Sequence, residues 1–214
     1  MTDIETAPVA EESSFEWLEL VAALLLGIAG LLTAYAAYYG SLAGGDALQG
    51  YTKSSRTTAD ANGFYTDYGQ TYAADQALFT QYQVLVQRGD QDTADVLKDN
   101  LFSPELVTAT DAWLAIPEGE GPPTPLDTDQ YQIESLTSAQ ALTEQADAEF
   151  AEAAKIDDQG DNFDLASVYL AVALFFAGIA TLFKVRKIQK GLLVGAFLLL
   201  FPGIWAIAKG KGWA

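Results

Sequence analysis

The chain has 214 residues, of which 29 are Asp or Glu and 11 are Lys or Arg, so its formal net charge is -18 although half of its residues are hydrophobic. It contains no Cys and no His, which excludes disulfides, thiol chemistry, imidazole acid–base catalysis and the usual zinc ligands. A chain this acidic, without a basic patch, also argues against nucleic acid as a partner.

The charged and hydrophobic residues are segregated along the chain. Residues 1–19 hold six acids and no base, residues 42–164 hold 23 acids and five bases, and residues 184–211 hold six bases and no acid. Three uncharged stretches lie between these segments or within the last one. The length of each is close to the roughly 20 helical residues that are needed to cross a bilayer. The sequence therefore predicts an all-α membrane protein with three transmembrane helices. Its acidity fits either a salty environment or a need for solubility.

The first predicted span is a transmembrane helix over residues 17–41, preceded by an acidic N-terminal tail over residues 1–16. Trp17 lies near one end of the span and several tyrosines lie near the other, as expected at the two membrane interfaces. A secretory signal peptide is the rival interpretation of this segment. Such a peptide needs a basic region before its apolar stretch, and the tail is acidic.

Residues 42–164 are predicted to form an acidic extramembrane bundle of three or four helices between the first and second spans. The helical pattern continues from the first span to Arg88, and another long helix leads into the second span. Because both long helices are tied to the bilayer at one end, we expect them to pair antiparallel.

Two shorter helices are predicted between the long ones. They cover residues 93–102 and 104–116, and Ser103 before Pro104 is a favourable N-cap for the second. The following segment, residues 118–127, is rich in Gly and Pro and is therefore predicted to be a loop.

An aromatic stripe follows the first span, with members at alternating steps of three and four residues. Its members are Tyr65, Tyr68, Tyr72, Asp75, Phe79, Tyr82 and Val86. One interpretation is a row of tyrosines that binds a ligand or a partner by stacking and hydrogen bonding. The other is a slightly polar coiled-coil seam between two long helices.

An acidic cluster comes just before the second span and is the only weak candidate for a metal site. Its members are Asp157, Asp158, Asp161 and Asp164. Several carboxylates near a Gly would suit a hard cation such as calcium, but their spacing does not match an EF-hand loop. A solvated turn, with Asp161 or Asn162 capping the next helix, is the alternative.

The second and third spans, over residues 165–183 and 191–208, are predicted to form a hairpin around a basic loop, residues 184–190. By the positive-inside rule this loop is cytoplasmic, which places residues 42–164 outside the cell membrane. The C-terminal tail, residues 209–214, opposes this orientation because it adds two lysines on the outer side. A Pro-Gly pair at residues 202–203 predicts a kink or a frayed end in the third span.

The uncharged parts of the spans, residues 20–41, 165–183 and 191–208, contain no Asp, Glu, Lys, Arg or His, which argues against a self-sufficient pump or carrier. They contain instead small residues at helix-packing spacing, which are Ala23, Gly27, Ala34, Gly191 and Gly195. These predict either an interface with a partner or packing among the protein's own spans. No nucleophile, phosphate-loop, dinucleotide or metalloprotease motif occurs, so we expect no enzyme activity and no cofactor.

Two segments, Ser54–Phe79 and Asp161–Lys187, give the chain a resemblance to a group of prokaryotic three-span membrane proteins. In these proteins a Tyr-, Ala- and Gln-rich coiled-coil segment follows the first span, and no activity is assigned to them. The resemblance implies the architecture alone. The layout is also similar to the helical input domains of membrane receptors, but it departs from them after the second span, where this chain returns to the membrane.

The function expected from these features is that of a non-enzymatic scaffold or accessory subunit in the cell membrane. Such a protein would contact membrane lipids and associate with itself, as a homo-oligomer, or with another membrane protein. The first alternative is an extracytoplasmic sensor whose helical domain binds a ligand or a cation. The second is an oligomeric pore whose uncharged spans form a hydrophobic gate.

Overall fold

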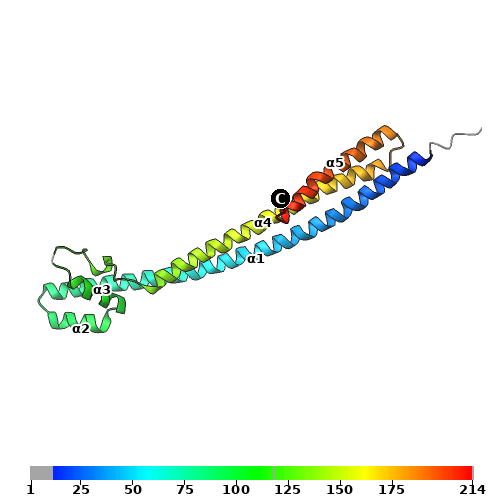
Figure 1. The fold of residues 1–214 in the computed structure, drawn as a ribbon. Coiled ribbons are helices and arrows are strands. Elements are labelled where there is room, and N and C mark those ends of the chain that lie inside the picture. The colour runs from blue at the N-terminus through cyan, green and yellow to red at the C-terminus, as the bar shows by residue number, and fades with distance from the viewer. Residues whose placement is uncertain (1–11, 118, 214) are drawn as a thin grey trace, which may run out of the picture. The chain divides into compact units, whose positions relative to one another are not determined.

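The structure is a computed structural model that describes residues 12–117 and 119–213, with side chains from residue 17 onward. The predicted acidic tail, residues 1–16, thus lies outside the described side chains. Every regular element in the described ranges is helical (Figure 1): α1 (Glu12–Gln87), α2 (Gln91–Leu101), α3 (Pro104–Leu114), the short 3-10 helix η1 (Pro125–Asp127), α4 (Glu134–Ala180) and α5 (Arg186–Gly210).

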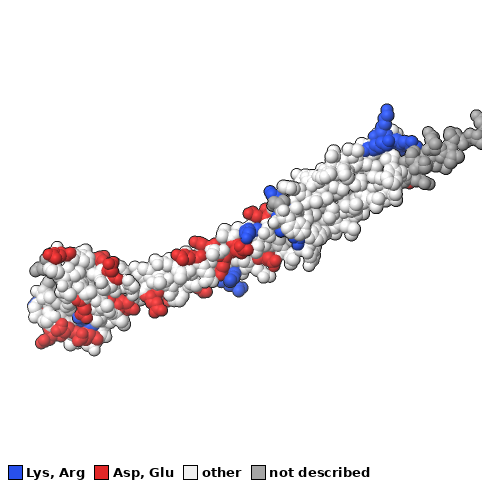
Figure 2. Space-filling model, in the orientation of Figure 1, with Lys and Arg blue, Asp and Glu red and all other residues white. Residues whose placement is uncertain are grey.

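Three of the described helices, α1, α4 and α5, are long and apolar enough to cross a membrane. This confirms the predicted all-α class with three candidate spans. Lys and Arg side chains gather where α5 begins, and the surface of the three helices beyond them is uncharged until charges return near the end of α5 (Figure 2). Such an uncharged band is what a lipid bilayer requires.

The chain divides into two compact units. Unit 1 comprises residues 1–51 and 150–214, and unit 2 comprises residues 52–149. Both α1 and α4 continue without a break from one unit into the other, as the predicted long helices do. The first long helix was expected to end near Arg88, and α1 ends at Gln87.

The core of unit 1 lies between α1, α4 and α5 and is built largely from alanine and leucine. Its buried residues include Ala22, Ala29, Ala36, Leu170, Ala173, Ala177, Leu193 and Ala196. Small side chains allow helix backbones to approach closely, which is the main source of packing energy where lipid surrounds the helices. Gly203 of α5 illustrates this, because a Cβ atom built there would lie 2.8 Å from Cγ of Leu170.

The α1–α4 pair is lined by small residues at seven-residue intervals. On α1 they are Gly40, Ala47, Ser54 and Ala61, and on α4 they are Ala139, Ala146, Ala153 and Gly160; all eight are buried. Within unit 1, Gly40 lies against Phe163 and Gly50 against Ala153. The residue numbers on α4 decrease as those on α1 increase, so the two helices are antiparallel, as predicted.

In unit 2, α2 and α3 pack against α1 around a second core. It consists of Phe79, Tyr82, Ala94, Phe102 and Leu106. Both short helices have side-chain caps: Asp90 accepts a hydrogen bond from the Thr93 amide at 3.3 Å, and Ser103 accepts one from the Leu106 amide at 3.0 Å. The predicted cap at Ser103 is confirmed, and α2 begins earlier than predicted because Asp90 caps it.

Three local predictions need correction. The turn predicted at residues 157–164 is wrong, because α4 is helical throughout this segment. Buried Gly160 faces Ala43 of α1 there, and the neighbouring acids are exposed on the helix surface, so no chain reversal is needed. The predicted basic loop, residues 184–190, is mostly the first turn of α5, and α5 continues through Pro202 to Gly210 without the predicted frayed end.

Candidate functional site

The predicted small-residue interface of the first span lies outside the core of unit 1. Ala23, Gly27 and Ala34 are all exposed, whereas the neighbouring alanines at 22, 29 and 36 are buried. A Cβ atom built at Gly27 would meet no described atom within 4 Å. The first span therefore has two small-residue faces. One face packs inside the fold. The other consists of Ala23, Gly27 and Ala34 and is called the open face of α1; no described helix lies against its Gly27.

The two glycines predicted as an interface on the third span have different surroundings. Gly195 packs inside unit 1, because a Cβ atom built there would lie 3.3 Å from a ring carbon of Phe176. Gly191 is exposed, and an added Cβ would meet no described atom within 4 Å. The pair thus does not form one continuous face, and Gly195 serves intramolecular packing.

The aromatic stripe of α1 is divided between core and surface. Phe79 and Tyr82 are buried, Tyr68 and Tyr72 are half-buried, and Tyr65 is exposed. Rings from the other helices complete the cluster, with Trp113 edge-on to Phe79 at 5.6 Å and Phe102 edge-on to Tyr82 at 5.7 Å between centroids. These rings fill the space between helices, as in the seam interpretation, but their partners belong to α3 and to the end of α2 and not to a second long helix.

A buried carboxylate lies within this seam. Asp75 is 2% exposed, and its Oδ2 accepts hydrogen bonds from the Ser103 hydroxyl at 2.6 Å and from the Tyr131 hydroxyl at 2.9 Å. Burial, together with the hydrogen bond to Asp75, raises the pKa of the Tyr131 phenol. Asp75 therefore connects α1 to the start of α3 and to the segment before α4.

Ser103 and Tyr131 were not predicted as partners of Asp75. The sequence did carry one signal, which is an acidic residue at a seam position that otherwise takes apolar or aromatic side chains. A buried charge requires hydrogen-bond donors nearby. Which residues donate these hydrogen bonds depends on the paths of the segments before α3 and before α4. Sequence spacing does not determine those paths.

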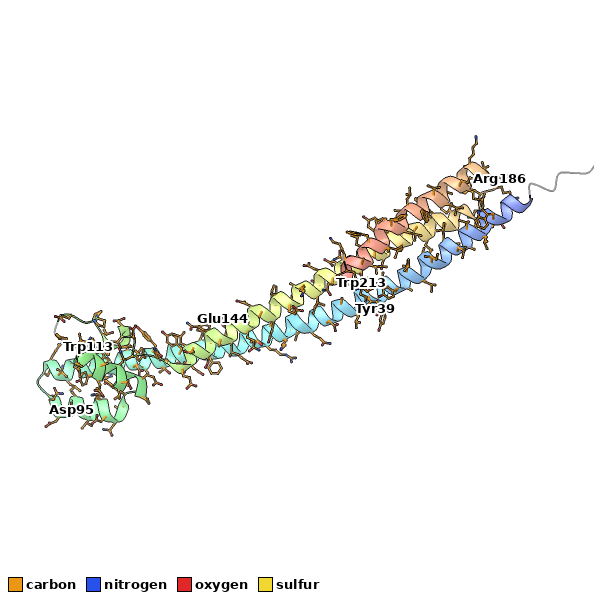
Figure 3. All side chains as sticks on the ribbon, in the orientation of Figure 1. Tyr39, Asp95, Trp113, Glu144, Arg186 and Trp213 are labelled. Carbon is orange, nitrogen blue, oxygen red and sulfur yellow. The ribbon has the colours of Figure 1, made fainter. Side chains whose placement is uncertain are left out.

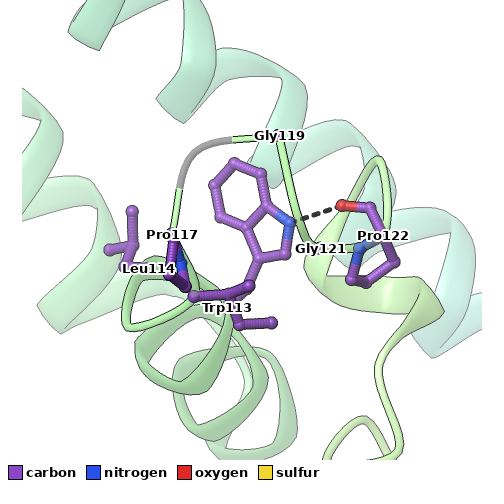
Figure 4. Close-up of a pocket in the computed structure, with 7 residues that line it drawn as sticks. Trp113, Leu114, Pro117, Gly119, Gly121 and Pro122 are labelled. Carbon is purple, nitrogen blue, oxygen red and sulfur yellow. Dashed lines mark hydrogen bonds between the residues drawn. The ribbon is translucent and has the colours of Figure 1, made fainter.

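A small cavity of about 380 Å³ lies beside Trp113 in unit 2 (Figure 4). The indole nitrogen of Trp113 donates a hydrogen bond to the Pro122 carbonyl at 2.8 Å, which holds the Gly- and Pro-rich loop over the ring. Gly119 in this loop has a φ of 85°, a backbone conformation that strongly favours glycine. The lining side chains are apolar, but polar atoms contribute almost as much of the cavity surface, so the cavity could accept a small molecule that carries both apolar and hydrogen-bonding groups.

The acidic cluster lies on the surface of α4 in unit 1. Asp157, Asp158, Asp161 and Asp164 are all exposed, and the Tyr51 hydroxyl donates a hydrogen bond to Asp157 at 3.3 Å. No three carboxylates among the described residues gather closely enough to hold a metal ion. The four residues extend over about two helical turns, so their carboxylates are spaced along the surface of α4, whereas a metal loop would converge them.

Comparisons with protein-family models, with curated proteins and with solved structures find no match to this chain. The resemblance to prokaryotic three-span membrane proteins therefore stays a prediction. The function is argued below from the geometry of the two units.

Proposed function

We propose that the protein is a non-enzymatic membrane scaffold or accessory subunit that associates with itself or with another membrane protein. The observation that carries this proposal is the open face of α1. Ala23, Gly27 and Ala34 repeat the small-residue pattern of the buried face but lie on the outside of the three-helix unit. Small residues on a lipid-facing helix allow a second helix to approach closely.

The proposal includes a topology in which residues 42–164 form an extramembrane bundle of three or four helices on the outer side. Its support is the charge distribution, since four bases lie within residues 184–190 at one end of the candidate spans. In this arrangement α1 and α4 connect the bundle directly to the membrane. Contacts made by the bundle and contacts made by the open face would then both involve α1.

The experiment compares two isoleucine variants of the full-length chain, Gly27→Ile and Leu31→Ile. Gly27 belongs to the open face, and Leu31 is 75% exposed one turn further along α1. Each variant is purified in mild detergent from its native host, and the chains that accompany it are quantified by mass spectrometry. A second, differently tagged copy of the chain reports self-association in the same preparation.

We expect Gly27→Ile to lose its partner or its second copy, because a branched side chain blocks close helix approach. Leu31→Ile should retain them. Circular dichroism should show that both variants keep their helices, since the space around Gly27 is open. If Gly27→Ile retains its companions as well as Leu31→Ile does, or if the unaltered chain is purified as a lone monomer, the proposal is wrong.

Ligand sensing is a second candidate function, favoured by the cavity beside Trp113. A small compound with apolar and hydrogen-bonding groups in this cavity would contact the indole ring and the loop that covers it. Compounds that bind there should raise the melting temperature of the unaltered chain but not of Ile116→Trp, whose larger ring would occupy the cavity. Equal shifts for both chains would show that the cavity is not the binding site.

A further inference from the structure

An apolar groove lies between α1 and α5 in unit 1, on a surface that would face lipid in a membrane. Its volume is about 470 Å³. It is lined by Trp17, Leu18, Val21, Leu24, Leu25 and Ile28 from α1 and by Lys190, Leu193, Val194 and Phe197 from α5. The lining side chains are therefore apolar with one exception, and this exception is a cation.

The groove is separate from the open face of α1. At about 100° per residue, the mean direction of the α1 side chains that line the groove differs by about 140° from the mean direction of Ala23, Gly27 and Ala34 around the helix axis. A ligand in the groove would therefore leave the open face available. The inference below rests on the topology of the proposed function, which places residues 184–190 on the cytoplasmic side, but not on the open face of α1.

The positive charge lies at one end of the groove. Lys190 lines the groove in the second turn of α5, and Lys187 precedes it by three residues and so shares its side of the helix. Both lysines are exposed. Glu19, the nearest acid on α1 with a described side chain, points about 160° away from the groove at 100° per residue. The groove thus combines an apolar channel with an ammonium group that no described acid of α1 neutralises.

We propose that this groove binds an acyl chain of an anionic phospholipid whose phosphate headgroup contacts Lys190. An acyl chain suits the apolar channel, and the long stem of Lys190 lets its ammonium group reach the headgroup region. Basic pockets between transmembrane helices on the cytoplasmic side are typical sites for anionic headgroups. A partner helix fits less well, because a helix with side chains is about 10 Å wide and because membrane-spanning helices rarely carry an acid that could match Lys190.

The test is native mass spectrometry of the full-length protein in mild detergent, with dioleoyl phosphatidylglycerol or dioleoyl phosphatidylcholine added. The two lipids have the same acyl chains and differ in headgroup charge. We expect the unaltered chain to retain phosphatidylglycerol more strongly. Lys190→Gln should lower the phosphatidylglycerol affinity about five-fold, the effect of one lysine near a lipid surface, and leave phosphatidylcholine unchanged. Lys209→Gln, which alters an exposed lysine at the other end of α5, is the matched control and should bind like the unaltered chain.

A second variant tests the apolar channel itself. Val194 is 58% exposed in the groove, so Val194→Trp fills the channel without disturbing the core, which its melting temperature should confirm. It should lower the retention of both lipids. Equal retention of the two lipids by the unaltered chain, or equal effects of Lys190→Gln and Lys209→Gln, would overturn the proposal. So would a cross-link from Val194→Cys to another protein chain, because a helix would then occupy the groove.

Discussion

The ammonium nitrogen of Lys211 lies 3.4 Å from the centre of the Tyr39 ring. The rings of Tyr35 and Phe163 surround the same nitrogen, with centroids at 5.8 and 5.9 Å. The contact joins the end of α5 to α1 and α4, at the opposite end of α5 from Arg186 (Figure 3, where Tyr39 and Arg186 are labelled). Lys211 therefore has a structural role, which is to hold the end of α5 against these aromatic rings. One of the two lysines that oppose the predicted orientation is thus explained by packing.

Replacing this cation should loosen the end of α5. Lys211→Met keeps the length of the side chain but removes its charge, and a cation–π contact of this kind contributes about 0.5–2 kcal/mol. The melting temperature of the full chain in mild detergent, followed by circular dichroism, should fall. Lys209→Met alters an exposed neighbour and should leave it nearly unchanged. Equal melting temperatures for the two variants would mean that the contact contributes nothing measurable.

Two glycines of α1 should respond to alanine in opposite directions. A Cβ atom at Gly50 would lie 2.7 Å from Cβ of Ala153, whereas one at Gly44 would meet no described atom within 4 Å. Gly44→Ala should therefore stabilise the chain by up to about 1 kcal/mol through helix propensity. Gly50→Ala should destabilise it by about 1–3 kcal/mol because the helices must separate. Chemical unfolding in detergent would measure both changes, and a stabilising Gly50→Ala would contradict the close α1–α4 packing.

Removing the buried carboxylate of Asp75 should destabilise unit 2. Asp75→Ala leaves the Ser103 and Tyr131 hydroxyls without their acceptor, which costs about 1–3 kcal/mol. Hydrogen exchange of the α3 amides measures the local free energy of opening and should show this loss. The exposed Asp60 offers a control, because Asp60→Ala should change exchange very little. Unaltered α3 protection in Asp75→Ala would mean that the carboxylate does not hold these elements together.

Tyr131 should resist ionisation at alkaline pH. Its pKa is raised in the folded chain, mainly by burial and by the hydrogen bond to Asp75, so the folded state holds this proton more tightly than the unfolded state does. The resulting stabilisation is complete below the ordinary tyrosine pKa of about 10 and is lost as the pH rises toward the folded pKa. The ordinary pKa of tyrosine is about 10. An ultraviolet titration of the folded chain at about pH 10–11 should therefore give the same tyrosinate signal with and without Tyr131→Phe. A smaller signal from the variant would show that Tyr131 ionises normally.

Much of the helical layout could be predicted from the sequence, because helix limits depend on local signals. The uncharged stretches, the Ser103 cap and the antiparallel pairing of α1 with α4 all follow from charge, spacing and chain connectivity. The turn predicted around Gly160 failed for a tertiary reason. A glycine among acids is typical of a turn, but here Gly160 packs against α1 and α4 stays helical through it.

The candidate sites were harder to predict because they depend on which side of a helix its neighbours occupy. Ala22 and Ala23 are adjacent and identical in the sequence, yet one is buried and the other belongs to the open face. Only the placement of α4 and α5 distinguishes them. The partners of Asp75 likewise come from α3 and from the loop before α4, and no periodicity links these segments.

The central claim is that three helices cross a membrane and hold residues 42–164 on the outer side, and cysteine labelling of intact cells tests it most directly. The chain has no cysteine, so single variants Gln140→Cys, Lys187→Cys and Leu31→Cys can each be probed with an impermeant maleimide. Gln140→Cys should react in intact cells, Lys187→Cys only after permeabilisation, and Leu31→Cys in neither case because lipid covers it. Labelling of Lys187→Cys but not Gln140→Cys in intact cells would invert the topology, and ready labelling of Leu31→Cys would contradict the membrane span itself.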